Sequence, residues 1–156
     1  MRHFTSTCAL PISVLLLGCG ADPSPPKTVR ADPGSGESYA RAVEELSQIN
    51  QQARAAFAKG KGDEAADLIQ RGEPLSKQLL SVPRPTLEAT EAASDLDQLY
   101  GDMLFSNRNY GWARLEFQKN LARWKYWSPQ TDETARRRQQ AADSIARCDS
   151  KIGKGR

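Results

Sequence analysis

The chain has 156 residues, 38% of them hydrophobic and 26% charged, which fits one folded domain with a modest core. A formal net charge of +3 is too close to zero for a general nucleic-acid binder. The only histidine, His3, lies in a segment that we expect to be removed, and at most two cysteines then remain. This excludes Ser-His-Asp and Cys-His catalysis and His- or Cys-rich zinc sites.

Residues 1–18 are expected to form a signal peptide. Arg2 supplies the positive charge near the start, and residues 9–17 are an apolar stretch. That stretch is shorter than the roughly 20 residues that a helix needs to cross a bilayer. A buried strand or helix is the alternative, but the Pro- and Gly-rich residues that follow offer nothing for it to pack against.

The residues Leu16-Leu17-Gly18-Cys19 end the apolar stretch, and they resemble the lipobox of bacterial lipoproteins. Leu17 departs from the motif, because Ala or Ser is commoner at that position. The resemblance implies cleavage before Cys19, acylation of its thiol and anchoring in a membrane of the cell envelope. Gly20 follows the cysteine where some bacteria place an Asp that retains lipoproteins in the inner membrane, so the outer membrane is favoured. The alternative is cleavage after Ala21 and release.

Residues 19–36 comprise the lipidated cysteine and a predicted linker. Four of the nine prolines and three of the eleven glycines fall in residues 20–36, without apolar periodicity. Once Cys8 is removed and Cys19 is acylated, Cys148 has no intramolecular partner. We therefore expect Cys148 to be buried on a helix face.

Residues 37–152 are expected to form an all-α domain, with a flexible tail over residues 153–156. Strong helix formers dominate this region, and no alternating apolar run is present. Asp63, Thr86 and Ser128 are the expected helix caps. Gly72 and Pro74 predict a kink or break in the second helix. The apolar spacing predicts helices over residues 38–59, 63–81, 86–106, 110–127 and 129–151.

The third and fourth predicted helices resemble a tetratricopeptide repeat, with Gly101, Tyr110, Ala113 and Phe117 at that family's relative spacings. Three departures are Asp97 in place of a large apolar residue, Leu104 in place of Tyr, and the expected proline, which is displaced to Pro129. The first two helices resemble a weaker copy through Ala53, Ala56, Ala65 and Ile69. The resemblance implies antiparallel helical hairpins, about two degenerate repeats and a C-terminal capping helix. An ordinary helical bundle is the alternative.

An aromatic cluster follows in the fourth predicted helix. Phe117 and Trp124 share a stripe with Ala113 and are predicted to be core, whereas Trp112 and Tyr126 point elsewhere. Exposed Trp and Tyr beside Arg are typical of binding hot spots. The predicted partner-binding residues are Trp112, Arg114, Tyr126 and Trp127. The alternative is that the fifth helix covers the aromatic residues.

Charge is distributed unevenly along the predicted helices. Residues 85–102 hold five acidic residues and no basic one, whereas residues 103–156 hold twelve basic and five acidic residues. A basic surface for anionic lipid or an acidic partner is one interpretation. We prefer the other, in which the basic residues pair with the acidic third helix.

These features predict a membrane-anchored envelope lipoprotein that serves as a non-catalytic adaptor for a protein partner. No nucleophile–base pair, phosphate loop or metal-ligand set is recognisable, so we expect no enzyme activity, no cofactor and no bound metal. Nucleic acid is not expected as a partner. The alternative is an envelope protein that binds a small ligand or glycan through Trp112, Tyr126 and Trp127.

Overall fold

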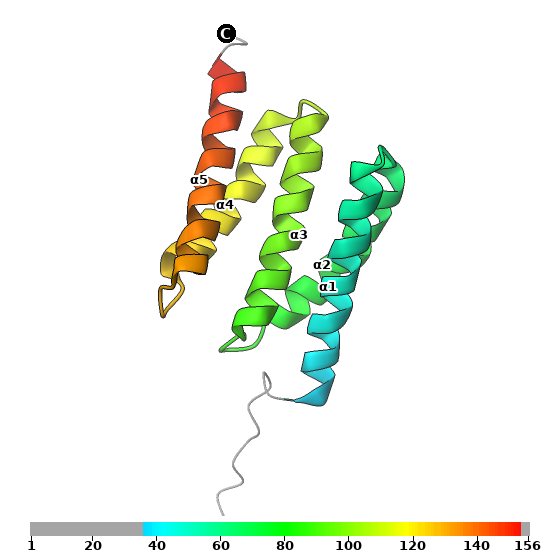
Figure 1. Ribbon diagram of the computed structural model, residues 1–156, viewed down its shortest axis with the longest axis vertical. Helices are drawn as coiled ribbons and strands as arrows, with labels where there is room; N and C mark the ends of the chain where they lie inside the picture. Colours follow the sequence, from blue (N-terminus) through cyan, green and yellow to red (C-terminus); the bar gives the residue numbers. More distant parts are fainter. Residues whose placement is uncertain (1–35, 154–156) are drawn as a thin grey trace, which may run out of the picture. The chain divides into compact units, whose positions relative to one another are not determined.

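The computed structural model describes residues 36–153, which form five α-helices and, in that range, no strand (Figure 1). The helices are α1 (Glu37–Ala58), α2 (Gly62–Leu80), α3 (Leu87–Ser106), α4 (Tyr110–Tyr126) and α5 (Asp132–Gly153). The all-α prediction is confirmed. The predicted signal peptide, the lipobox with Cys19 and nearly all of the linker lie outside the described residues, as do residues 154–156 of the predicted tail. Gly153 was assigned to that tail but is the last residue of α5.

Successive helices run antiparallel, and α3 lies between α1 and α5 (Figure 1). α3 packs against α1, α2 and α4, α1 packs against α2, and α4 packs against α5. Polar side chains also join α3 to α5, as where the Gln98 amide donates to the Ser144 hydroxyl at 3.4 Å. α3 therefore contacts both of the helices that run in its own direction.

The larger apolar cluster joins α1 and α2 to one side of α3. Two polar contacts to backbone carbonyls supplement it. The Tyr39 hydroxyl donates to the Leu79 carbonyl at 3.0 Å, and the Asn50 amide donates to the Ala92 carbonyl at 2.7 Å. Most side chains in the cluster are aliphatic, so this side is held mainly by the hydrophobic effect. Its best-buried members are Leu46, Ala53, Ala65, Leu79 and Ala89.

α2 continues as one helix through Gly72 and Pro74, so the predicted break does not occur. Gly72 lies at a close approach between helices. A Cβ built there would stand 3.0 Å from a methyl carbon of Leu96 and 3.2 Å from one of Leu46. The missing side chain thus lets α2 approach α1 and α3 closely at this position.

The α1–α2 and α3–α4 turns have the same geometry. Each contains one residue of positive φ, Gly60 at 73° in the first turn and Arg108 at 63° in the second. The residues after them, Lys61 and Asn109, have nearly equal backbone angles, with φ/ψ of −87°/68° and −83°/57°. Both donate to the carbonyl five residues earlier, which is the six-to-one bond of a Schellman helix end. The two turns lie 48 residues apart in the sequence.

The helix starts match the predicted caps only in part. Thr86 caps α3 as predicted, accepting from the Ala89 backbone N–H at 3.2 Å. Asp63 is not the cap of α2, because the helix already begins at Gly62 and Asp63 lies in its first turn. Ser128 is not the cap of α5, which begins at Asp132. Thr131 takes that place and accepts from the Thr134 backbone N–H at 3.2 Å.

A smaller cluster lies where α3, α4 and α5 meet. Ala113, Phe117 and Cys148 are fully buried there, and Leu104, Phe105 and Ile145 pack against them. A Cβ on Gly101 would stand 2.5 Å from the Phe117 ring, so only glycine leaves room for that ring. The predicted burial of Phe117 and Cys148 is confirmed.

Candidate interaction surface

One face of α4 is buried in the fold. Phe117 and Trp124 are fully buried, and the Trp124 indole N–H donates to the Ser94 hydroxyl of α3 at 2.8 Å. The Asn120 amide donates to the Ser94 carbonyl at 2.9 Å. Both bonds reach α3, and the Phe117 and Trp124 rings are buried between α4 and its neighbours α3 and α5. These contacts fix which face of α4 points into the fold.

The opposite face of α4 carries large apolar side chains in solvent. Trp112 is 67% exposed, Leu115 is 48% exposed and Tyr126 is 77% exposed. Lys119 and Ala122 are also exposed, and with them these residues follow one another at steps of three, four, three and four. Residues at that spacing lie along one line of a helix. We call this line the α4 stripe: Trp112, Leu115, Lys119, Ala122 and Tyr126.

The four predicted partner-binding residues do not form one site. Trp112 and Tyr126 lie on the α4 stripe, about 21 Å apart along the helix. Arg114 instead points to α5, where its Nε lies 2.6 Å from an Asp149 carboxylate oxygen. Trp127 is half-buried, with its ring edge-on to Trp124 at 6.2 Å between centroids. The alternative in which α5 covers the aromatic residues therefore holds for Trp124 but not for Trp112 or Tyr126.

Leu115 and Lys119 were missing from the predicted site. The sequence spacing alone places both residues on one helix line between Trp112 and Tyr126. The sequence does not show that α5 leaves this line of α4 uncovered.

Basic residues of α4 and α5 neutralise the acidic α3. Arg123 lies 2.8 Å from Asp97, and Arg147 lies 3.3 Å from Asp102. The preferred interpretation of the charge pattern, pairing with the acidic helix, is confirmed for these residues. The basic residues of α5 are therefore not all available to an anionic surface.

Arg137 is the most buried of these bases, with 15% of its side chain exposed. It lies 2.8 Å from Asp95 and 3.7 Å from Glu91, and it stacks over the Trp124 ring at 5.5 Å. Burial by itself lowers the pKa of Arg137, but the surrounding carboxylates raise that pKa above its ordinary value. The guanidinium therefore stays charged while it joins α5 to α3.

The α4 stripe lies on a helix that has more basic than acidic residues. α4 carries four basic residues and a single acid, Glu116, whose side chain is 10% exposed. Lys119 Nζ lies 2.6 Å from Glu116, and Lys125 Nζ lies 5.2 Å from the Tyr126 ring centroid. Burial opposes the charge of Lys119, yet the bond to Glu116 raises its pKa above the ordinary value. No carboxylate within residues 36–153 forms an ion pair with Lys125.

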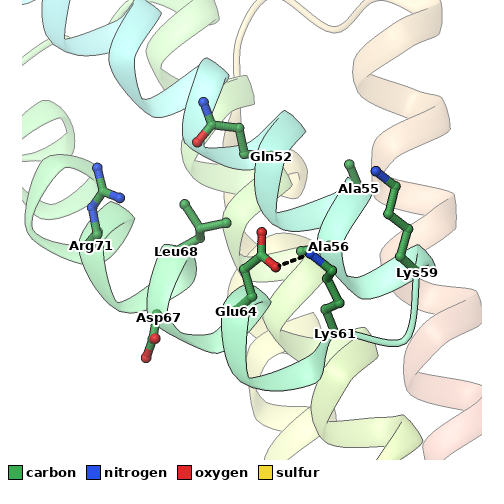
Figure 2. Close-up of a pocket in the computed structure, with 9 residues that line it drawn as sticks. All are labelled: Gln52, Ala55, Ala56, Lys59, Lys61, Glu64, Asp67, Leu68 and Arg71. Carbon is green, nitrogen blue, oxygen red and sulfur yellow. Dashed lines mark hydrogen bonds and ion pairs between the residues drawn. The ribbon is translucent and has the colours of Figure 1, made fainter.

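A groove of about 670 Å³ lies on the α1–α2 hairpin (Figure 2). Ala56 and Leu68 are its buried lining residues. Its rim is charged and exposed. Two of the rim residues pair with each other, since Lys61 Nζ donates to the Glu64 carboxylate at 2.8 Å (Figure 2). No Ser, Thr, Cys or His is among the residues that line it.

Among the described residues, no three His, Cys, Asp or Glu side chains gather in a way that could hold a metal ion. None of the described helices is both long and apolar enough to cross a membrane.

Comparisons with known proteins add no family. No protein-family model, no curated protein and no solved structure matches the chain.

Proposed function

We propose that the protein is a lipid-anchored envelope protein whose helical domain is a non-catalytic adaptor for another protein. The observation that carries the adaptor role is the α4 stripe, where Trp112, Leu115 and Tyr126 stay exposed on a helix whose other face is fully packed. Large exposed aromatic residues flanked by cations are the usual anchors of protein interfaces. The lipid anchor rests on the resemblance of residues 16–19 to a lipobox.

We further propose that the domain is tetratricopeptide-like. The equal geometry of the α1–α2 and α3–α4 turns supports two related hairpins. The space that Gly101 leaves for the Phe117 ring agrees with the small and large positions of that repeat. α5 would then serve as the capping helix, since it covers the last hairpin with small buried side chains.

A protein partner is favoured over a glycan by the separation of the aromatic residues. Trp112 and Tyr126 are about four helical turns apart, so one sugar ring cannot contact both. Trp127, the third residue of the glycan alternative, packs against Trp124 instead of joining either. A long surface is better matched by an elongated partner.

The membrane anchor is tested by intact mass and membrane fractionation of the native chain beside Cys19→Ser. We expect a mass that lacks residues 1–18 and carries acyl chains, with recovery in the outer-membrane fraction. The Cys19→Ser variant should lose both properties. A full-length, unacylated cytosolic product would contradict the proposal.

The adaptor role is tested by replacing Trp112 and Tyr126 together with alanine in the anchored protein. We expect the envelope proteins that co-purify with the wild type to be lost, while far-ultraviolet circular dichroism stays unchanged. The matched control is Ile152→Ala, because Ile152 is an exposed apolar residue that belongs to α5 and not to the stripe. Unchanged co-purification with an intact fold would exclude the stripe as the contact site.

A further inference from the structure

We infer that the α4 stripe binds one amphipathic helix of the partner, and that this helix carries a carboxylate opposite Lys119. The inference rests on the proposed adaptor function and specifies its partner. It follows from the width of the stripe, the position of Lys119 and the charge around it.

The width of the stripe matches a helix–helix contact. Its five residues follow the alternating three- and four-residue steps that define the contact line of a coiled coil. On α4 the stripe is flanked by polar residues, Glu116 and Arg123 on one side and Gln118 and Lys125 on the other, so its apolar part is narrow. A narrow line of this kind suits a second helix laid along it, whereas the apolar face of a helix buried in a larger surface is broader.

Lys119 stands in the middle of the stripe, seven residues from Trp112 and seven from Tyr126. A lysine at one contact position of a coiled coil selects the partner and the register at some cost in stability. Its side chain is 56% exposed even while its ammonium is bonded to Glu116, which leaves room for a second carboxylate. An acidic residue opposite it would complete the contact.

The central lysine also argues against a second copy of this chain. A two-fold pairing centred on the stripe places Lys119 against Lys119 of the other copy, and like charges in close contact oppose association. An acidic partner avoids that repulsion and gains from Lys125, which forms no ion pair within the described chain.

A lipid surface is the weaker alternative. Helices that lie on membranes present a wide apolar face with cations at its edges. Here a cation occupies the middle of a line that holds only three large apolar side chains.

The stripe spans about 21 Å, so the partner helix should be about four turns long.

The first test places a photoreactive residue at position 115 or 122 of the anchored full-length chain and maps the products by mass spectrometry. We expect both positions to join the same partner protein, at residues of one segment separated by three, four or seven positions. The same residue at position 152 is the control and should give no such product.

The outcomes separate the inference from the proposed function. Products with one protein at residues without helical spacing would contradict the partner helix but not the adaptor role. Products with lipid, or with a second copy of this chain, overturn the partner as stated. Absence of any protein product overturns both.

The second test reverses the charge. We expect Lys119→Glu to weaken the partner about tenfold or more, as for a residue at the centre of an interface. Changing the mapped carboxylate of the partner to Lys should restore binding to that variant. Lys119→Met, which keeps an unbranched side chain without the charge, should weaken binding less. Thermal unfolding of each variant separates a folding defect from a binding defect. If the change of the partner's carboxylate to Lys does not restore binding to Lys119→Glu, the proposed carboxylate contact is wrong.

Discussion

On the side of α3 that faces α1 and α2, the buried side chains are mostly Leu, Ile and Ala, and the contact is mainly apolar. On the side that faces α4 and α5, the fully buried cluster is small, and Asp95, Asp97 and Asp102 bind arginines across the boundary. Ion pairs weaken as salt screens their charges, whereas aliphatic packing has no charges to screen. The two sides of one helix therefore have different responses to solution conditions.

The largest effect should come from Trp124→Ala. Trp124 is fully buried and bonded to Ser94, so its loss leaves a cavity and should lower the free energy of unfolding by about 3–5 kcal/mol. Urea unfolding followed by circular dichroism measures this. Amide exchange should accelerate in α4 and α5 more than in α1 and α2. The control is Tyr126→Ala, exposed on the same helix, which should change stability by less than about 0.5 kcal/mol. Equal losses would contradict the description of the two faces of α4.

A smaller effect is expected from Arg137→Gln. The change leaves Asp95 and Glu91 without their partner and should cost about 1–3 kcal/mol, between the values for exposed and buried ion pairs. The difference in unfolding free energy from wild type should shrink in 1 M salt, because the Debye length falls to about 3 Å. The control is Arg138→Gln, because Arg138 is an exposed neighbour that forms no ion pair within residues 36–153. A salt-independent loss would mean that packing on Trp124, not charge, is what Arg137 contributes.

The smallest effect concerns pH. Bonds from Arg136, and also from Arg137, hold the pKa of Glu133 at about 2, below its ordinary 4.5. Since the pKa is lower in the folded state, the stabilising contribution is complete above pH 4.5 and is lost as pH falls towards 2. The thermal midpoints of wild type and Glu133→Gln should therefore converge over that range. The side chain is 43% exposed, so solvent reduces the effect. A gap that stays constant from pH 5 to 2 would exclude this pair as a source of acid sensitivity.

Much of the fold follows from apolar spacing, because long helices with one buried stripe repeat their signal over several turns. The stripe of α5 is the exception. The apolar residues Ala135, Ala142, Ile145 and Cys148 predict its buried face. Cys148 is buried as predicted, but the other three are half-buried and the remaining buried residues are Thr134, Ala141 and Ser144. Small polar residues that pack against large aromatic ones give no hydrophobic signal, so the predicted face is only partly correct.

The surface was predictable only in part. Trp112 and Tyr126 fall off the line of Ala113, Phe117 and Trp124, and this alone places them outside the core. The contact of Arg114 with Asp149 depends on where α5 lies, which no local spacing reports. Helix starts were similarly ambiguous, since Ser128 and Thr131 are both good caps and only Thr131 bonds the first turn of α5.

The burial of Cys148 has a practical consequence. Burial raises the pKa of its thiol, so the reactive thiolate is scarce while α5 is docked. If Cys8 is removed and Cys19 acylated as proposed, no other thiol remains in the mature chain. The rate at which a thiol reagent labels the protein would then report how often α5 detaches, in living cells as well as in solution.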